Sequence, residues 1–204
     1  LRRPLAALKL SLYNIRSKRT NPAIDVHINR CDEKIFEGER IINNLLESAD
    51  LKEPRLEEID LHEMISECLE EVETNFGDYS VRIELDIEPL RNIPCPADPV
   101  QMRSVVSNIL QNAFESLPRE TGTINVTGFT DEKNLGFTVT DTGEGIPEAD
   151  IERVFEPFYT TKHRGVGLGL TVTHEIIGLH NGILDIRSRP GEGTAVTVSL
   201  PRIT

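Results

Sequence analysis

The sequence predicts an α+β protein in which an antiparallel helical hairpin precedes a sheet with helices on one face. Over the first fifty residues, apolar side chains recur at alternating spacings of four and three, which is typical of packed helices. Beyond Pro54 this pattern gives way to short alternating strands separated by helical segments. We therefore expect a hairpin domain over residues 1–55 and an α+β domain over residues 56–204.

The first segment has the periodicity of two long helices joined by a turn that contains Pro22. Because two helices cannot enclose a four-helix core alone, we expect a homodimer through residues 1–50 that completes a four-helix bundle. The residues of the predicted seam are Leu1, Leu5, Leu8, Leu12 and Ile15 in the first helix, and Ile24, Ile28, Cys31, Ile35, Gly38, Ile42, Leu45 and Ala49 in the second.

The second segment contains capping signals and strand patterns. Asp60 followed by Glu63 predicts a capped helix, and Asp98-Pro99 predicts a second helix that extends to about Leu117. Residues 50–60 are expected to form a linker. Further strands are predicted at 81–87, 123–130, 135–141, 183–188 and 194–200, and a further helix at 168–180.

Composition narrows the class of protein. Of the 204 residues, 38% are hydrophobic and 27% are charged, as in soluble globular proteins. No apolar run approaches the ~18 residues of a membrane span, so we expect a cytoplasmic chain, with any membrane connection made through segments outside it. The cysteines, Cys31, Cys68 and Cys95, are odd in number and widely spaced, which argues against a disulfide framework or a cysteine metal site.

Charge is unevenly distributed along the chain. The net charge is −12, which disfavours nucleic-acid binding. Residues 1–20 hold six basic side chains and no acid, so they contribute +6 and the remainder carries −18. This basic stretch fits either a solvated helix face or a docking face for an acidic partner.

Asn108 and Asn112, in the stretch NILQNA, lie four residues apart on a predicted helix and therefore share one face. Amide oxygens can ligate a hard cation that already holds phosphate oxygens, although two asparagines on a helix are more often simple surface residues. In DTGEGIP, Asp141 ends a predicted strand and could accept a hydrogen bond from an exocyclic amine such as that of adenine. Gly143 and Gly145 would let the backbone turn sharply or approach a flat ring. A calcium loop is the alternative, but the carboxylates that an EF-hand requires further on are missing.

The stretch GVGLGL, residues 165–170, leads directly into a predicted helix, where free backbone N–H groups and the helix dipole favour phosphate. It is neither a Walker A loop nor a Rossmann fingerprint, because the glycines are spaced two apart and no Gly-Lys-Ser/Thr follows. In GEGTAVTVSL, Thr194 follows a turn and could reach a water bound to a base.

In this order and spacing, the four stretches resemble the ATP-binding domain of the GHKL superfamily, and most closely that of sensor histidine kinases of two-component systems. NILQNA is similar to the N box, DTGEGIP to the G1 box, VFEPFYTTK (154–162) to the F box, GVGLGL to the G2 box and GEGT to the last box. The resemblance covers roughly residues 60–204. It implies a two-layer α/β sandwich that binds ATP and Mg²⁺, with a short lid of the nitrogen-regulation type.

The resemblance also assigns roles. It implies that Asp141 recognises adenine, that Asn112 holds Mg²⁺ and acts in catalysis, and that Asn108 contacts phosphate or water. Lys162 in the lid would pair with the γ-phosphate, or would simply be solvated. The remaining residues expected to contact nucleotide are Gly143, Gly145, Ile146, Thr161, Gly165, Val166, Gly167, Leu168, Gly169, Leu170 and Thr194.

The opening LRRPL is similar to the second half of the phosphoacceptor motif H-[ED]-L-R-x-P-L, so the acceptor histidine is expected immediately before Leu1. These resemblances imply a kinase core that transfers the γ-phosphoryl of ATP to a histidine on the dimerisation helix. An aspartate in the receiver domain of a response regulator would then accept it. A nucleotide-binding pseudokinase and another GHKL ATPase are the alternatives. ATPases of the superfamily place a glutamate base four residues before the magnesium asparagine, where this chain has Asn108.

Overall fold

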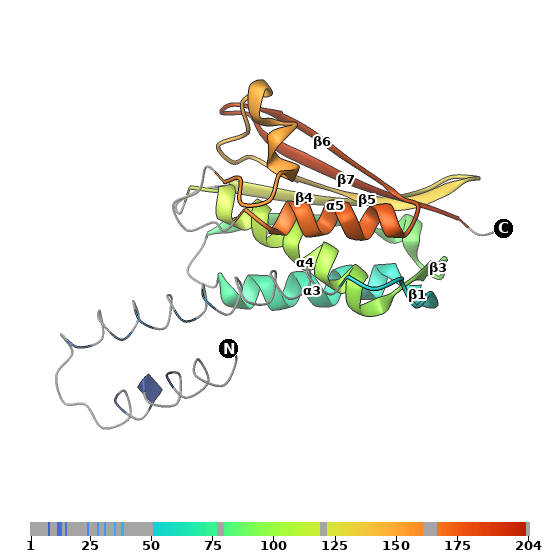
Figure 1. The fold of residues 1–204 in the computed structure, drawn as a ribbon, viewed down its shortest axis with the longest axis horizontal. Coiled ribbons are helices and arrows are strands. Elements are labelled where there is room, and N and C mark those ends of the chain that lie inside the picture. The colour runs from blue at the N-terminus through green and yellow to red at the C-terminus, as the bar shows by residue number, and fades with distance from the viewer. Residues whose placement is uncertain are drawn as a thin grey trace.

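The computed structural model describes residues 51–76, 80–118, 122–160 and 167–202, together with nine helical residues of the N-terminal segment. The predicted hairpin and its dimer interface otherwise lie outside the described residues. In the described part, a five-stranded sheet forms one layer and helices cover one of its faces (Figure 1). This arrangement confirms the mixed α/β character expected beyond Pro54.

The sheet has the strand order β2-β4-β5-β7-β6, from β2 (Val81–Asp86) through β4 (Gly122–Thr130), β5 (Asn134–Asp141) and β7 (Gly193–Pro201) to β6 (Ile183–Arg189). Strands β4 and β5 form an antiparallel hairpin, as do β6 and β7, because short turns join them. Strand β2 pairs with β4 in parallel, since a helical crossover lies between them in sequence. This order brings the end of β5 directly beside the start of β7.

Three helices form the second layer: α3 (Leu61–Asn75), α4 (Pro99–Ser116) and α5 (Gly169–Leu179). The predicted caps are confirmed. The Asp60 carboxylate accepts a hydrogen bond from the backbone N–H of Glu63, and Asp98 accepts bonds from the N–H groups of Val100 and Gln101, all at 3.0 Å. Short 3-10 turns occur at Glu88–Leu90, Glu148–Asp150 and Arg153–Phe155.

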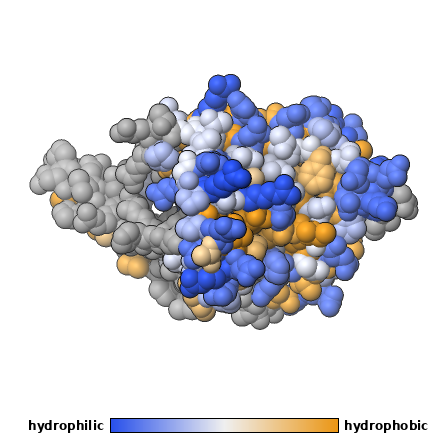
Figure 2. All heavy atoms as spheres, turned by 90° about the horizontal axis from the view of Figure 1, so that it is seen from above, coloured by the Kyte–Doolittle hydropathy of each residue, from blue (hydrophilic) through white to orange (hydrophobic). Residues whose placement is uncertain are grey.

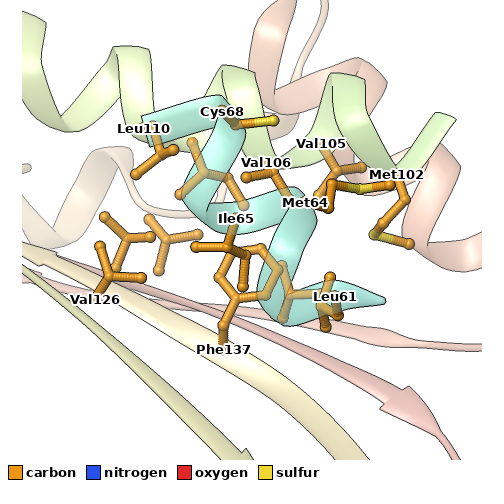
Figure 3. Close-up of a cluster of buried hydrophobic side chains, with 14 of the residues drawn as sticks. Leu61, Met64, Ile65, Cys68, Met102, Val105, Val106, Leu110, Val126 and Phe137 are labelled. Carbon is orange, nitrogen blue, oxygen red and sulfur yellow. The ribbon is translucent and has the colours of Figure 1, made fainter. Parts of the chain in front are cut away.

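The core lies between the helical layer and the sheet. Side chains of α3 and α4 meet over the inner faces of β4 and β5 (Figure 3). The fully buried residues there include Phe114, Phe137 and Leu61. Because side chains alternate between the two faces of a strand, threonines such as Thr138 and Thr197 lie on the outer face, where their hydroxyls form a hydrogen bond with each other at 2.9 Å. From above, the surface is mostly hydrophilic, with apolar residues gathered in a band near its middle (Figure 2).

The linker prediction over residues 50–60 is partly wrong. Residues Glu57–Asp60 form β1, which pairs antiparallel with β3 (Pro94–Ala97). Buried Ile59 lies opposite buried Cys95. Pro94 and Pro96 lack an N–H donor, which makes β3 a poor strand by sequence rules but is tolerated in a sheet of only two strands.

A buried histidine joins the ends of two helices. The Nδ1–H of His180, which follows α5, donates to the carbonyl of Ile176 at 2.8 Å, so its Nε2 is left to accept the N–H of Asp98 at 3.0 Å. Asp98 in turn accepts the backbone N–H of Arg55 at 3.0 Å. The start of α4, the end of α5 and the segment before β1 are therefore tied together. Among the described residues, no helix has the length and apolarity needed to cross a membrane.

Candidate nucleotide site

A cavity opens between α4, the ends of β5 and β7, and the start of α5. Residues from all these elements line it, so segments distant in sequence contribute to one space. Ten of the predicted site residues are among them: Asn108, Asn112, Asp141, Gly145, Ile146, Gly167, Leu168, Gly169, Leu170 and Thr194. Apolar side chains, including Ile109, Val139, Ile186 and Val196, complete the walls and suit a flat aromatic group.

Asp141 is the buried charged residue at the sheet end of this cavity, with only 5% of its surface exposed. Its Oδ1 accepts the Gly143 N–H at 2.8 Å and, at 2.9 Å, the Ser116 hydroxyl, whose single proton is shared with the Ala113 carbonyl at 2.8 Å. A buried carboxylate is stable only when donors surround it, and here two donors come from the chain itself. The side chain is thus held as a fixed hydrogen-bond acceptor.

The glycines of DTGEGIP serve this arrangement in different ways. A Cβ on Gly143 would lie 2.1 Å from the Ser116 hydroxyl oxygen and 2.7 Å from Asp141 Oδ1, so any side chain there would disrupt the carboxylate. Gly143 is absent from the cavity wall and instead positions Asp141. Gly145 has φ of +72°, and its Cβ would lie 2.0 Å from the carbonyl oxygen of Arg189. Glycine at position 145 is therefore required for the loop to pass the β6–β7 turn.

Thr194 lies directly opposite Asp141 in the pairing of β5 with β7. It is 9% exposed and lines the cavity. The preceding Gly193 has φ of +96°, and a Cβ there would lie 1.9 Å from the Asp141 carbonyl oxygen. The close approach of β7 to β5 at this point therefore depends on glycine.

The opposite wall of the cavity is one face of α4. Asn108 and Asn112 line it from successive turns, as their spacing predicts. The Asn108 Nδ2 atom is buried and has no hydrogen-bond partner among the described residues. A Cβ built on Gly169 would lie 3.6 Å from Asn108 Oδ1 and 3.9 Å from Asn112 Nδ2, so both amides meet the first residue of α5.

The start of α5 lies beside these amides and has no side-chain cap. The residue preceding the helix is Leu168, whose side chain makes no capping hydrogen bond. The first N–H groups of a helix need partners from outside it, and an anion is a favourable one. Gly167 has φ of +68°, and its carbonyl accepts the Phe158 N–H at 2.8 Å, which closes the base of the loop before α5.

The donor set fits a magnesium ion. The buried Asn108 Nδ2, which has no partner in the described structure, is a hydrogen-bond donor that suits a phosphate oxygen or water. Two neutral amide side chains, each with an oxygen acceptor, converge at the start of α5, which has no side-chain cap. Hard cations that carry phosphate oxygens prefer oxygen ligands of this kind. No group of three or more histidine, cysteine or acidic side chains able to hold a metal by itself occurs among the described residues. A metal at this position would therefore depend on the phosphates of its ligand for most of its coordination.

The cavity wall is acidic. Of its described residues, Asp141, Glu115 and Glu144 are acids, and none is lysine, arginine or histidine. A triphosphate would therefore need positive charge from a bound cation and from segments beyond the described residues. Residues 161–166 lie outside the described residues, and they include four predicted contacts, Thr161, Lys162, Gly165 and Val166. These contacts stay predictions, as does the short lid.

Three residues of this region escaped prediction. Ser116 and Ser188 hold the polar end of the cavity through their hydroxyls, and Tyr159 lines the wall. Ser116 lies four residues after Asn112, so helical periodicity carried one turn further would have placed it on the same face. The Tyr159 ring is contacted by Arg153, which does not itself line the wall and whose guanidinium lies 4.3 Å from the ring centroid.

Comparison with known proteins agrees with this geometry. Residues 97–204 match the family described as histidine kinase-, DNA gyrase B- and HSP90-like ATPases. Sporulation kinase A of Bacillus subtilis is 34% identical over 99% of this chain and 33% of its own length. The sensor histidine kinase ZraS of Escherichia coli K12 is 32% identical over 79% of this chain and 34% of its own length. The chain thus spans about a third of the length of these curated relatives.

A solved structure of the mycobacterial sensor histidine kinase MprB superposes with a TM-score of 0.63 at 28% identity, over 72% of this chain and 97% of that chain. The matched residues 97–204 contain α4, the end of β5, the start of α5 and the start of β7, which are the elements that build the cavity. The chain therefore belongs to the histidine kinase-, DNA gyrase B- and HSP90-like ATPase family, and within it to the sensor histidine kinases.

Proposed function

We propose that this chain is the catalytic core of a sensor histidine kinase that binds Mg-ATP in the cavity beside Asp141. The observation that carries the proposal is the placement of two chemically different ends in one cavity. A buried carboxylate with Thr194 lies at the end of the sheet, and two asparagines meet an uncapped helix start at the other wall. A base and a triphosphate require these two environments.

Each end has a separate role. Asp141, fixed by Ser116 and Gly143, accepts a hydrogen bond from the exocyclic amine of the base. The backbone N–H groups at the start of α5 hold phosphate oxygens, Asn112 would hold Mg²⁺, and Asn108 contacts a phosphate oxygen or water nearby. The metal would supply neutralisation of the charge that develops on the transferred phosphoryl group. The protein's own contribution is positioning, because no described side chain in the wall is a cation that could neutralise this charge.

Asn108 favours phosphoryl transfer over hydrolysis. It lines the wall one turn before Asn112, where a glutamate could activate an attacking water. A neutral amide cannot remove a proton from water. The γ-phosphoryl group is therefore preserved for a histidine, which the resemblance places on the dimerisation helix, and then for an aspartate of a response regulator.

Two measurements test the proposal. The chain should bind Mg-ATP in equilibrium dialysis. A version extended by His-Glu immediately before Leu1 should then incorporate acid-labile, base-stable label from γ-labelled ATP. The matched control carries Gln-Glu in the same place and should remain unlabelled. Binding of ATP without any label on the extended chain would contradict the kinase assignment, and label on the unextended chain would move the acceptor to one of its five histidines.

A further inference from the structure

We propose that Ser188 sets the direction of the Thr194 hydroxyl, so that the base end of the cavity offers acceptors only and selects a 6-amino purine over a 6-oxo purine. Ser188 lies on β6, outside the cavity wall, and acts through Thr194 as a positioning residue. The inference rests on the proposed nucleotide site and concerns how that site chooses its base.

Three polar residues form a row across three neighbouring strands. Asp141 on β5 is paired with Thr194 on β7, and Thr194 is paired with Ser188 on β6. Because side chains of paired residues lie on the same face of a sheet, all three point toward the helical layer. The row lies at the end of the inner face of the sheet, beyond the last apolar core residues.

The Ser188 hydroxyl makes three contacts with a single proton. It accepts the backbone N–H of Ile146 at 2.7 Å and donates to the carbonyl of Gly193 at 2.8 Å. Its third contact, with the Thr194 hydroxyl, is 2.9 Å long. Because the Gly193 carbonyl can only accept, the arrangement that satisfies all three contacts gives the serine proton to Gly193 and takes the proton between the two hydroxyls from Thr194.

Thr194 therefore faces the cavity with lone pairs only. Its neighbour Asp141 is a carboxylate whose Oδ1 already accepts two hydrogen bonds, and an ionised carboxylate can only accept. Both polar groups at this end thus require a donor from the ligand, directly or through a water that donates to them. The 6-amino group of adenine is such a donor, whereas the 6-oxo group of hypoxanthine or guanine is an acceptor.

Replacing Ser188 by alanine removes the oxygen that receives the Thr194 proton. The threonine hydroxyl can then rotate and donate into the cavity, where it suits a 6-oxo group. One hydrogen bond of this kind is worth a factor of roughly three to ten in affinity. We expect the ratio of the dissociation constants for Mg-ITP and Mg-ATP to fall by roughly three- to tenfold in Ser188→Ala, since Mg-ITP gains a bond while the rotating hydroxyl can still accept from Mg-ATP.

The experiment is equilibrium dialysis of Mg-ATP and Mg-ITP against the full chain, its Ser188→Ala and Ser188→Thr variants, and a control. Ser188→Thr keeps the hydroxyl and should restore the wild-type ratio. The matched control is Thr138→Val, which removes another cross-strand hydroxyl pair, Thr138 with Thr197, on the outer face of the same sheet. It should leave the ratio unchanged.

The outcomes separate this inference from the assignment of the site. If Ser188→Ala weakens both nucleotides by the same factor, or leaves the ratio within twofold, Ser188 has only a structural role and the inference is wrong. If Ser188→Ala does not fold, Ser188→Thr provides the test, and a ratio of the two dissociation constants that differs from the wild-type ratio overturns the inference. If the unchanged chain binds neither nucleotide, the proposed function fails as well.

Discussion

Replacing Asp141 by asparagine should greatly weaken ATP binding while leaving the fold intact. Asparagine has nearly the same shape, and its Oδ1 can still accept from Ser116 and Gly143, as the carboxylate does at 2.9 and 2.8 Å. The second carboxylate oxygen becomes an NH₂ group, which cannot accept from the adenine amine. Hydrogen bonds to a charged group contribute about 1.5–3 kcal/mol, so we expect ATP affinity to fall by roughly ten- to hundredfold.

Folding stability should respond much less. Two charge-assisted bonds become neutral ones, which costs about 1 kcal/mol each, but the penalty for burying a charge also disappears. We therefore expect a loss of at most about 2 kcal/mol in the free energy of unfolding, measured by urea denaturation. The matched control is Asp185→Asn, because Asp185 is half exposed on β6 and, among the described residues, pairs with Arg187 alone at 3.0 Å. It should change neither stability nor ATP affinity appreciably.

Titration calorimetry with Mg-ATP decides the matter. The reasoning is refuted if Asp141→Asn binds ATP within threefold of the unchanged chain while remaining folded. It is also refuted if Asp185→Asn weakens binding equally, because general charge rather than a placed acceptor would then explain the loss.

Four other predictions concern stability and accessibility. Gly167→Ala should destabilise the chain by about 1–3 kcal/mol in urea unfolding, because φ is +68° and the new Cβ would lie 2.3 Å from the Tyr159 carbonyl oxygen. Gly178→Ala, on helix α5 with no described atom within 4 Å of its Cβ, should instead stabilise it by about 0.5–1 kcal/mol. Burial would raise the pKa of Asp98, but three backbone N–H donors hold that pKa below its usual range. The contribution of Asp98 to folding stability is therefore present near neutral pH and is lost as pH falls through the folded pKa. The stability of Asp98→Asn should accordingly fall less than that of the unchanged chain below about pH 4. Burial raises the pKa of the Cys95 thiol to about 12, so a thiolate-directed reagent at pH 8 should modify it only at the rate of unfolding.

The sequence could predict those parts of the fold and site that depend on local rules. The caps at Asp60 and Asp98 were predictable because a capping side chain bonds to an N–H only two or three residues away. The shared face of Asn108 and Asn112 follows from helical geometry alone. In each case the interaction and its signal lie within one turn of the chain.

The features that escaped prediction depend on contacts between distant segments. Strand β1 is stabilised by the burial of Ile59 opposite Cys95. Its partner β3 contains prolines, which are unfavourable in strands, so propensity rules do not predict β3. Alternation along β6 places Ser188 on the inner face, but nothing local indicates that Thr194 is the residue beside it. That neighbour follows from the register of β6 with β7, which the intervening turn determines.

The same register makes base recognition depend on the β6–β7 turn. Side chains alternate along a strand, so a slip of one residue in β7 would move Thr194 to the outer face and bring an alanine toward Asp141. Gly193 opposes such a slip, because a Cβ at this position would lie 1.9 Å from the Asp141 carbonyl oxygen, so β7 can begin this close to β5 only with glycine. The Gly191 N–H also donates to the Glu144 carbonyl at 2.8 Å, which ties the turn to the loop that carries Gly145. A substitution in this turn, although it contacts no ligand, should therefore change base selectivity before it changes phosphate binding, since the start of α5 is built independently of it.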